Sequence, residues 1–359
     1  MSLLAIELND AGIRAARADG EGLLPVDGEH RESPGFAWMR KDEIVTGRKA
    51  WDQARRHSLG VDARFWDQLD TQPVDPRDVH SPNRAEVAYE HLRRVVEQVR
   101  RPDEAVVIAV PPFYDRRQLG LLVGIARELK LPLRGLVASP IAIPPELVPS
   151  GTFMVVDLGL QRCSLSVVES GEHLRVARTY ASPDVGLLTF WRQWVKAVGG
   201  EFVRKTRFDP LHDADTEQQL HDALFAILDS GEYSAGVRLE LDVGTRVHRV
   251  TVTDQMLADA GHGLVLELCR DAEDARATYD PSVVLVTYDA AWAPGLERTL
   301  QRQLSVPVRA LPAGAAAIGL AQLWPDRFET ADGDGVAYHP RRTREETAPP
   351  ASEPVTVTS

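Results

Sequence analysis

The residue types that could do chemistry are clearest between Thr152 and Ser170, TFMVVDLGLQRCSLSVVES. An apolar run ends in Asp157, a turn containing Gly159 follows, and a second run alternates apolar and small polar residues. This pattern predicts a β-hairpin. An acidic residue that ends a buried strand and faces a glycine turn can present a metal-bound phosphate to backbone N–H groups. The pattern also fits a plain surface hairpin in which Asp157 only caps the turn.

The N-terminus repeats this design. A short apolar run from Leu3 to Leu8 carries Glu7, and a turn that includes Asn9 and Asp10 leads into a second strand-like run. Taken alone, Glu7 also fits a solvated residue at a strand end. Two similar hairpins far apart in the chain indicate two related halves, each with an acidic residue near a turn.

Composition restricts the partners of this chain. Its 359 residues suffice for two domains with a large core, and 43% of them are hydrophobic. The net charge of −12 argues against a nucleic-acid interface and against attraction to an anionic membrane. The N-terminus lacks the pattern of a signal peptide, no run is apolar enough to span a membrane, and the two cysteines, Cys163 and Cys269, cannot form a disulfide framework. We therefore expect a cytoplasmic bacterial protein that neither binds nucleic acid nor inserts into a membrane.

Strand and helix patterns alternate around the two hairpins. In the first half, the sequence predicts a helix over Asn83–Val99 with Ser81 or Asn83 as cap, a helix over Asp115–Leu129 with Asp115 as cap, and strands over Glu104–Val110 and Leu133–Ala138. A strand, a helix and a strand in this order predict a parallel βαβ unit.

The second half is predicted to be similarly mixed. Helices are expected over Val185–Val198, over Thr216–Leu228 with Asp215 or Thr216 as cap, and over Gln255–Ala272 after the cap Thr253, and a hairpin is expected over Val237–Val252. The aromatic face of the first of these helices, with Phe190, Trp191 and Trp194, is interpreted as core packing. The polar, proline-containing stretch from Glu329 to Ser359 predicts a disordered tail.

The segment Val106 to Pro144, VVIAVPPFYDRRQLGLLVGIARELKLPLRGLVASPIAIP, resembles the ATPase domain of DnaK-type heat-shock chaperones. Other segments match that family in the same order, over about residues 3 to 323: AIELNDAGIRAA, TGRKAWDQA, VVDLGLQRCSLSVVE, VVLVTYDAAWAPGLERTL and ALPAGAAAIGLA. The resemblance implies the α/β fold of the actin-like ATPase superfamily. Two lobes, residues 1–150 and 151–328, would each hold a mixed five-stranded sheet flanked by helices, with a central cleft between them and a tail at 329–359.

The match is poorest at the site that the resemblance implies. The first-hairpin Asp of the family is Glu7 here, its catalytic Lys is Trp51, and the Glu of its N-E-P-T turn is Ser139. In the second hairpin Asp157 and Gly159 are kept, but Leu160 and Gln161 replace two glycines and Arg162 replaces a Thr. Arg162 could supply a cation for phosphate or could be a solvated turn residue. The nucleotide contacts carried over by the resemblance are Glu7, Asn9, Asp10, Asp157, Gly159, Arg162, Gly186 and Gly314, with Glu7 and Asp157 as the metal ligands.

Phosphoryl transfer depends on positioning and on charge neutralisation. Loss of the Lys and of one carboxylate should cost on the order of 10²-fold or more in rate for each group. The sequence thus predicts weak or absent binding of ATP and Mg²⁺, no clear catalytic residue, and a chaperone-like module that binds or scaffolds an unknown protein partner. No peptide-binding β-sandwich is expected after Leu323.

Other hypotheses remain open at this point. The first alternative is an active ATPase with a rearranged site made of Glu7, Asp10, Asp157 and Arg162. The second is an actin-like cytoskeletal or pilus-assembly protein. A sugar kinase fits less well, since its catalytic Asp after a glycine-rich turn has only the weak candidate stretch from Ala181 to Gly186.

Overall fold

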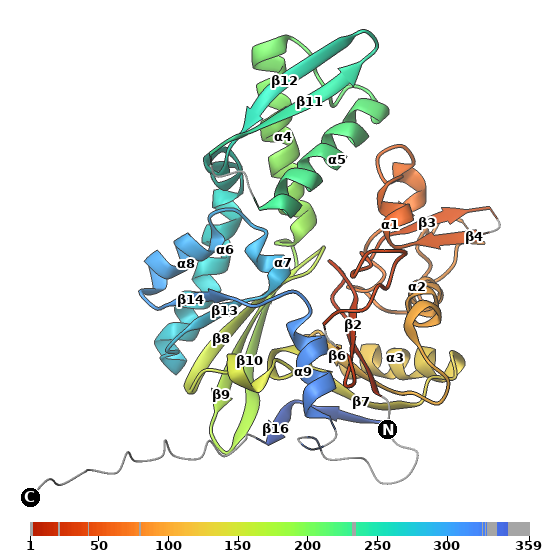
Figure 1. The fold of residues 1–359 in the computed structure, drawn as a ribbon, viewed down its shortest axis with the longest axis vertical. Coiled ribbons are helices and arrows are strands. Elements are labelled where there is room, and N and C mark those ends of the chain that lie inside the picture. Colours follow the sequence, from red (N-terminus) through yellow and green to blue (C-terminus); the bar gives the residue numbers. More distant parts are fainter. Residues whose placement is uncertain are drawn as a thin grey trace, which may run out of the picture.

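The computed structural model describes residues 3–20, 22–41, 43–78, 80–231, 235–324, 326, 328 and 336–343. The chain is mixed α/β, with several mixed sheets flanked by helices (Figure 1). We call residues 3–150 the N-terminal half and residues 151–343 the C-terminal half. Each half contributes most strands of one large sheet, and the candidate site lies between these two sheets.

The first large sheet has the strand order β15-β7-β6-β1-β2. Its strands are β1 (Leu3–Glu7), β2 (Arg14–Arg17), β6 (Ala105–Val110), β7 (Leu133–Ala138) and β15 (Ala337–His339). β1 pairs in parallel with β6 and β6 with β7, whereas β2 returns antiparallel to β1. Apart from Glu7, the buried residues of β1 and β6 are apolar, as expected for strands covered on both sides.

Helices α2 (Arg84–Val99) and α3 (Arg116–Glu128) accompany this sheet, and the predicted βαβ unit is confirmed as β6-α3-β7. The predicted caps Asn83 and Asp115 are also confirmed. Each forms a capping box, in which its side chain accepts a backbone N–H and the third helical residue bonds back to the cap. These bonds fix where the helices begin.

A small sheet stands beside the first large sheet, with the order β4-β3-β5. It consists of β3 (Ala37–Arg40), β4 (Glu43–Thr46) and β5 (Val61–Asp62). Between β4 and β5 the chain forms α1 (Arg48–Trp51) and η1 (Ser58–Gly60). This sheet carries α1 and its Trp51 toward the C-terminal half.

The second large sheet has the order β14-β13-β8-β9-β10-β16. Its strands are β8 (Gly151–Leu158), β9 (Cys163–Ser170), β10 (His173–Ser182), β13 (Val284–Val286), β14 (Val308–Ala310) and β16 (Arg341–Thr343). β8 and β9 form the predicted hairpin, closed by the pair Leu158 and Cys163. The sheet has six strands where five were predicted, because β16 adds to the edge at β10.

The other elements of the C-terminal half are α4 (Leu187–Thr206), α5 (Ala214–Ser230), α6 (Asp254–Tyr279), α7 (Tyr288–Ala291), α8 (Leu296–Leu304), α9 (Ala315–Leu323), the hairpin β11 (Val237–Val243) and β12 (Arg246–Val252), and, where the halves join, η2 (Ser139–Ile141) and η3 (Pro145–Leu147). The hairpin and the cap Thr253 are confirmed. The helix predictions were too short. α4 continues through Gly199 and Gly200, and Leu211 packs against Gly199. α5 begins after the cap Asp213, since that side chain accepts the first free N–H groups.

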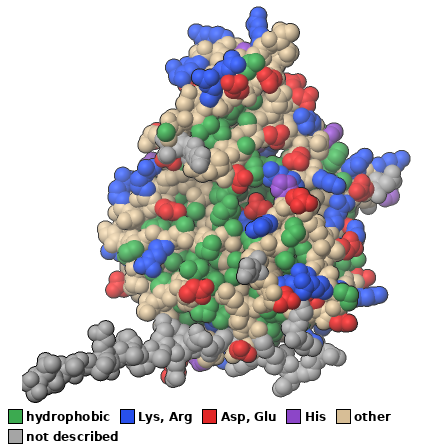
Figure 2. Space-filling model, viewed as in Figure 1, with side chains coloured by type: hydrophobic (Ala, Val, Ile, Leu, Met, Phe, Trp, Pro, Cys, Tyr) green, Lys and Arg blue, Asp and Glu red, His purple; other side chains and the backbone are tan. Residues whose placement is uncertain are grey.

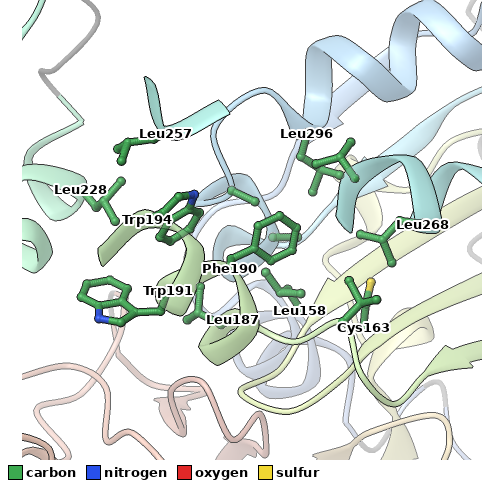
Figure 3. Packing of buried hydrophobic residues seen from close by; sticks show 14 of the residues in the cluster. Leu158, Cys163, Leu187, Phe190, Trp191, Trp194, Leu228, Leu257, Leu268 and Leu296 are labelled. Atoms are coloured by element: carbon green, nitrogen blue, oxygen red, sulfur yellow. The ribbon is translucent and has the colours of Figure 1, made fainter. Parts of the chain in front are cut away.

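The largest core cluster lies between α4, the second large sheet and α6 (Figure 3). Phe190, Trp191 and Trp194 of α4 are at most 1% exposed and lie among leucines of β8 and α6, which confirms the core-packing interpretation. The two cysteines are both buried and unpaired by disulfide. Within the described ranges, no helix is long and apolar enough to cross a membrane.

The C-terminal strands correct the prediction of a disordered tail. Residues 337–339 pair in parallel with β7 and residues 341–343 pair antiparallel with β10, so this short segment joins both large sheets. His339 packs against Trp324, with the ring centroids 5.7 Å apart. Each strand is too short to show the alternation of apolar and polar residues that marks a strand, and both lie in a polar, proline-containing stretch. For this reason the sequence pattern did not predict these strands. The rest of the predicted tail lies outside the described residues.

Candidate functional site

The two predicted phosphate hairpins meet between the two large sheets. Asn9 donates its side-chain amide to Oδ1 of Asp157 at 2.9 Å, and Thr287 donates its hydroxyl to the same oxygen at 2.8 Å. Oδ1 of Asp10 accepts the backbone N–H of Leu160 at 2.7 Å. The acidic groups of each hairpin are thus hydrogen-bonded to the other half of the chain.

The predicted glycines are required by packing within the protein. A Cβ at Gly159 would lie 2.4 Å from Oδ1 of Asp10, so this glycine makes room for that carboxylate. A Cβ at Gly186 would lie 2.2 Å from the backbone of Gln161, and one at Gly314 would lie 2.2 Å from the side chain of Leu23. At each of these glycines, a group of the chain itself occupies the space beside the backbone.

Glu7 lies at the end of β1 and is 8% exposed. Its Oε2 accepts the backbone N–H groups of Ala316 and Ala317, at 3.0 Å and 3.2 Å, in the first turn of α9. A carboxylate is stabilised at a helix N-terminus by these free N–H groups and by the helix dipole. Burial raises the pKa of Glu7, while the nearby Arg14 charge lowers it. The donors that α9 could offer to a phosphate are therefore already used.

Arg14 is the residue at this site that sequence reasoning missed. It lies on β2, is 1% exposed, and donates from its two terminal nitrogens to both carboxylate oxygens of Asp289, each at 2.7 Å. It also donates to Glu32 at 2.5 Å and lies 3.8 Å from Glu7. Burial alone would lower the pKa of Arg14, but the charges of Asp289, Glu32 and Glu7 outweigh it, so that the pKa is raised. The sequence signal for Arg14 was its place among the apolar residues of 13–16, because an arginine that is buried in such a run needs an acidic partner.

Arg162 forms the second ion pair between the halves. Its guanidinium bonds to both carboxylate oxygens of Asp67 and lies 4.6 Å from the centroid of the Phe113 ring. A cation over an aromatic face is attracted by the ring quadrupole. In this conformation Arg162 is thus paired with Asp67 rather than being a solvated turn residue, and its role toward a phosphate stays a prediction.

The acidic groups at this junction are crowded. Burial raises the pKa of Asp157 to about 7, with a further contribution from the Asp289 charge. Burial likewise raises the pKa of Asp10 to about 7, against the bond from Leu160. Among the residues that the structure describes, no group of three or more His, Cys, Asp and Glu side chains is arranged to hold a metal ion.

Little space remains around these groups. A cavity of about 20 Å³ lies on each side of the bond between Asn9 and Asp157. One is lined by Asp10, Asp67, Tyr114 and Arg162 among others, and the second by Glu7, Ser139, Tyr288 and residues of α9. Each holds about one water molecule. Sites for drug-sized ligands occupy about 300–1,000 Å³, so neither of these two cavities is large enough for a nucleotide in this conformation.

Trp51 closes the junction at its far end. It is 8% exposed, and its ring lies edge-on to Trp191 of α4, with the centroids 5.5 Å apart, and 5.9 Å from Phe225 of α5. Arg48 places its guanidinium 4.1 Å from the centroid of the same Phe225 ring. The position that the resemblance assigns to a catalytic lysine is thus an aromatic contact between the halves.

A serine, a histidine and an aspartate also meet in the N-terminal half, but they form a structural network. Trp66 donates its indole N–H to Nδ1 of His91 at 2.9 Å, so Nε2 carries the ring hydrogen and donates to Oγ of Ser33 at 2.8 Å. Ser33 in turn donates to Asp27 at 2.9 Å. Proton donation runs from the histidine to the serine, opposite to the activation of a nucleophile. Burial lowers the pKa of His91 to about 3.

A scan against models of protein families found no match for this chain, and a search of the curated proteins found none either. The site is therefore interpreted from its own geometry.

Proposed function

We propose that this protein is a divergent, chaperone-like member of the actin-like superfamily that acts as a binding or scaffolding module without nucleotide turnover. The observation that supports it best is the closed junction between the two large sheets. The protein's own side chains are bonded to one another at the positions that the sequence resemblance assigns to a nucleotide, its metal and a catalytic lysine. Two large mixed sheets, each with a hairpin facing the other, are compatible with the duplicated fold that the sequence resemblance implies.

The residues at the junction do not fit ATP with Mg²⁺. The carboxylates expected to bind the metal, Glu7 and Asp157, accept bonds from α9 and from Asn9 and Thr287. One buried cation beside the site, Arg14, is engaged by Asp289 and Glu32. A nucleotide would have to break these buried ion pairs, and each uncompensated buried charge is costly. We therefore assign no catalytic step to this site.

The first alternative, an ATPase with a rearranged site, has less support. Each of its four residues, Glu7, Asp10, Asp157 and Arg162, is hydrogen-bonded to another part of the chain. For the cytoskeletal alternative, the geometry offers no specific observation in its favour.

Calorimetric titration with ATP and Mg²⁺ tests the proposal. We expect no binding at millimolar nucleotide and no release of phosphate. Asp157→Ala serves as the matched variant, because it removes the acceptor shared by Asn9 and Thr287. Micromolar binding by the wild type, with turnover that Asp157→Ala abolishes, would refute the proposal and favour the ATPase.

A further inference from the structure

The solvent-exposed side of α4 carries an excess of positive charge. Its exposed basic residues, together with the residue that ends the helix, are Arg192, Lys196, Arg204, Lys205 and Arg207, and we call them the basic face of α4. Glu201 is the one acidic residue of α4, and it pairs with Arg204 at 2.7 Å and Lys205 at 2.9 Å. Within the described ranges, Lys196 and Arg207 form no ion pair. The chain as a whole has a net charge of −12, so the charge of this face has the opposite sign to the net charge of the chain.

This face belongs to the upper end of the molecule in Figure 1, where α4 runs beside α5 and the β11–β12 hairpin. Figure 2 shows Lys and Arg side chains gathered at that end. The β12 strand adds the exposed Arg246 and Arg249, of which Arg249 pairs with Glu240. The hairpin also exposes Glu240 and Asp242, so its surface charge is mixed.

Apolar side chains lie within the basic face. Val203 is 41% exposed and Leu211 is 38% exposed, and both belong to the few large hydrophobic residues with such exposure in the described structure. Leu211 lies over Gly199, at 3.1 Å from the position of a Cβ there, one helical turn before Val203. Val203 is thus flanked by the cations of α4, whereas Leu211 stands in a loop that also exposes Asp209 and Asp213. A surface of this kind, apolar at its centre and charged at its rim, is typical of protein interfaces.

Gly200 lies open within the basic face. No atom lies within 4 Å of the position of a Cβ there, whereas Leu211 occupies the space of a Cβ at Gly199. Gly120 and Gly124 of α3 and Gly263 of α6 are equally open, so Gly200 is one of several helix glycines without such a neighbour. Gly200 is exposed and lies one turn before Val203 and Arg204, so a side chain added there would stand on the basic face.

We propose that the basic face of α4 is the docking surface for an acidic, amphipathic segment of a partner protein. The carboxylates of that segment would meet Lys196, Arg204 and Arg207, and its apolar side chains would meet Val203 and Leu211. Electrostatic complementarity of this kind steers association and selects the partner. The inference rests on the interaction role proposed above, but it is tested separately, because nucleotide binding involves none of these residues.

The probe is a fluorescein-labelled synthetic helix with Glu and Leu at amphipathic spacing, titrated with the full-length protein and followed by anisotropy. We expect binding that weakens as the salt concentration rises. Lys196→Glu with Arg204→Glu should weaken binding at least tenfold. The matched control, Arg116→Glu with Arg117→Glu on α3, makes the same change of net charge on exposed residues of the other half and should leave binding within twofold.

Gly200→Leu separates docking from folding. We expect it to weaken binding of the probe while the helical circular dichroism and the unfolding midpoint stay at or above the wild-type values, because leucine favours a helix more than glycine does. Three results would overturn the proposal. They are no binding by the wild type at low salt, an equal loss of binding in the α3 control, or equally tight binding of phosphatidylglycerol vesicles with the same dependence on Lys196 and Arg204.

Discussion

Replacement of Arg14 by methionine is the most direct test of how the two halves are held together. The guanidinium makes two bonds of 2.7 Å to Asp289 and one of 2.5 Å to Glu32, with 1% of the residue exposed. Methionine keeps much of the side-chain volume but leaves the buried carboxylates without a cation. Removing one partner of a buried ion pair typically costs about 3–5 kcal/mol. We expect a loss in this range at pH 7, since Asp289 is 6% exposed and cannot be rehydrated without opening the junction.

Urea unfolding followed by tryptophan fluorescence measures this loss. Arg40→Met is the control, because Arg40 pairs with Glu43 at 3.4 Å on the surface, where ion pairs contribute about 0–1 kcal/mol. The double variant Arg14→Met with Asp289→Leu should recover part of the loss, since it removes one stranded charge. A loss below about 1 kcal/mol for Arg14→Met, or no recovery in the double variant, would show that the Arg14 network does not hold the halves together.

Three further predictions concern pH and glycine packing. Burial raises the pKa of Asp10 from 3.8 to about 7, so the native state holds this proton more tightly than the unfolded chain, and stability is lost as the pH rises from about 4 through 7. Asp10→Asn should therefore be more stable than the wild type at pH 8, by at most on the order of 4 kcal/mol and by less because Asp10 is partly exposed. Equal unfolding midpoints of the two proteins at pH 8 would contradict this. Burial lowers the pKa of His91 from 6.5 to about 3, so the contribution of neutral His91 to the free energy of unfolding is complete above pH 6.5 and is lost toward pH 3, with about 2 kcal/mol gone at pH 5. The urea midpoints of the wild type and His91→Gln should therefore converge as the pH falls from 7 to 5. Gly319→Ala should destabilise the protein by about 1–3 kcal/mol, because the added Cβ would lie 2.0 Å from the carbonyl oxygen of Ala142. Gly200→Ala, in contrast, should stabilise it by about 1 kcal/mol. Calorimetric melting temperatures that rank the two variants in the reverse order would refute the packing argument.

Local patterns predicted much of the architecture. The caps Asn83, Asp115 and Thr253 mark helix starts in the structure as they do in the sequence. This works because a cap satisfies the N–H groups of residues two or three positions away, so the whole interaction is contained in the local sequence. The two acidic hairpins were also found from sequence, since alternation and a glycine turn are local signals as well.

The contacts that define the site could not be predicted in this way. Arg14 and Asp289 are separated by 275 positions, and Asn9 and Asp157 by 148. Nothing local to Arg14 indicates which acidic residue meets it, because the partner is set by how the two large sheets face each other. Trp51 shows the same limit. Its aromatic type excludes the chemistry of a lysine, but its contact with Trp191 depends on the placement of α4.

α4 connects the closed junction with the basic face. Near its start, Trp191 contacts Trp51 and its indole donates to His221 of α5, while near its end the same helix presents Val203 and Arg204. These buried contacts fix the orientation of α4 before any partner arrives. A docking surface that is already ordered loses less conformational entropy on binding. Under the proposed function, closure of the junction thus serves to present α4, and loosening the contact at Trp51 should weaken docking at a face that Trp51 does not touch.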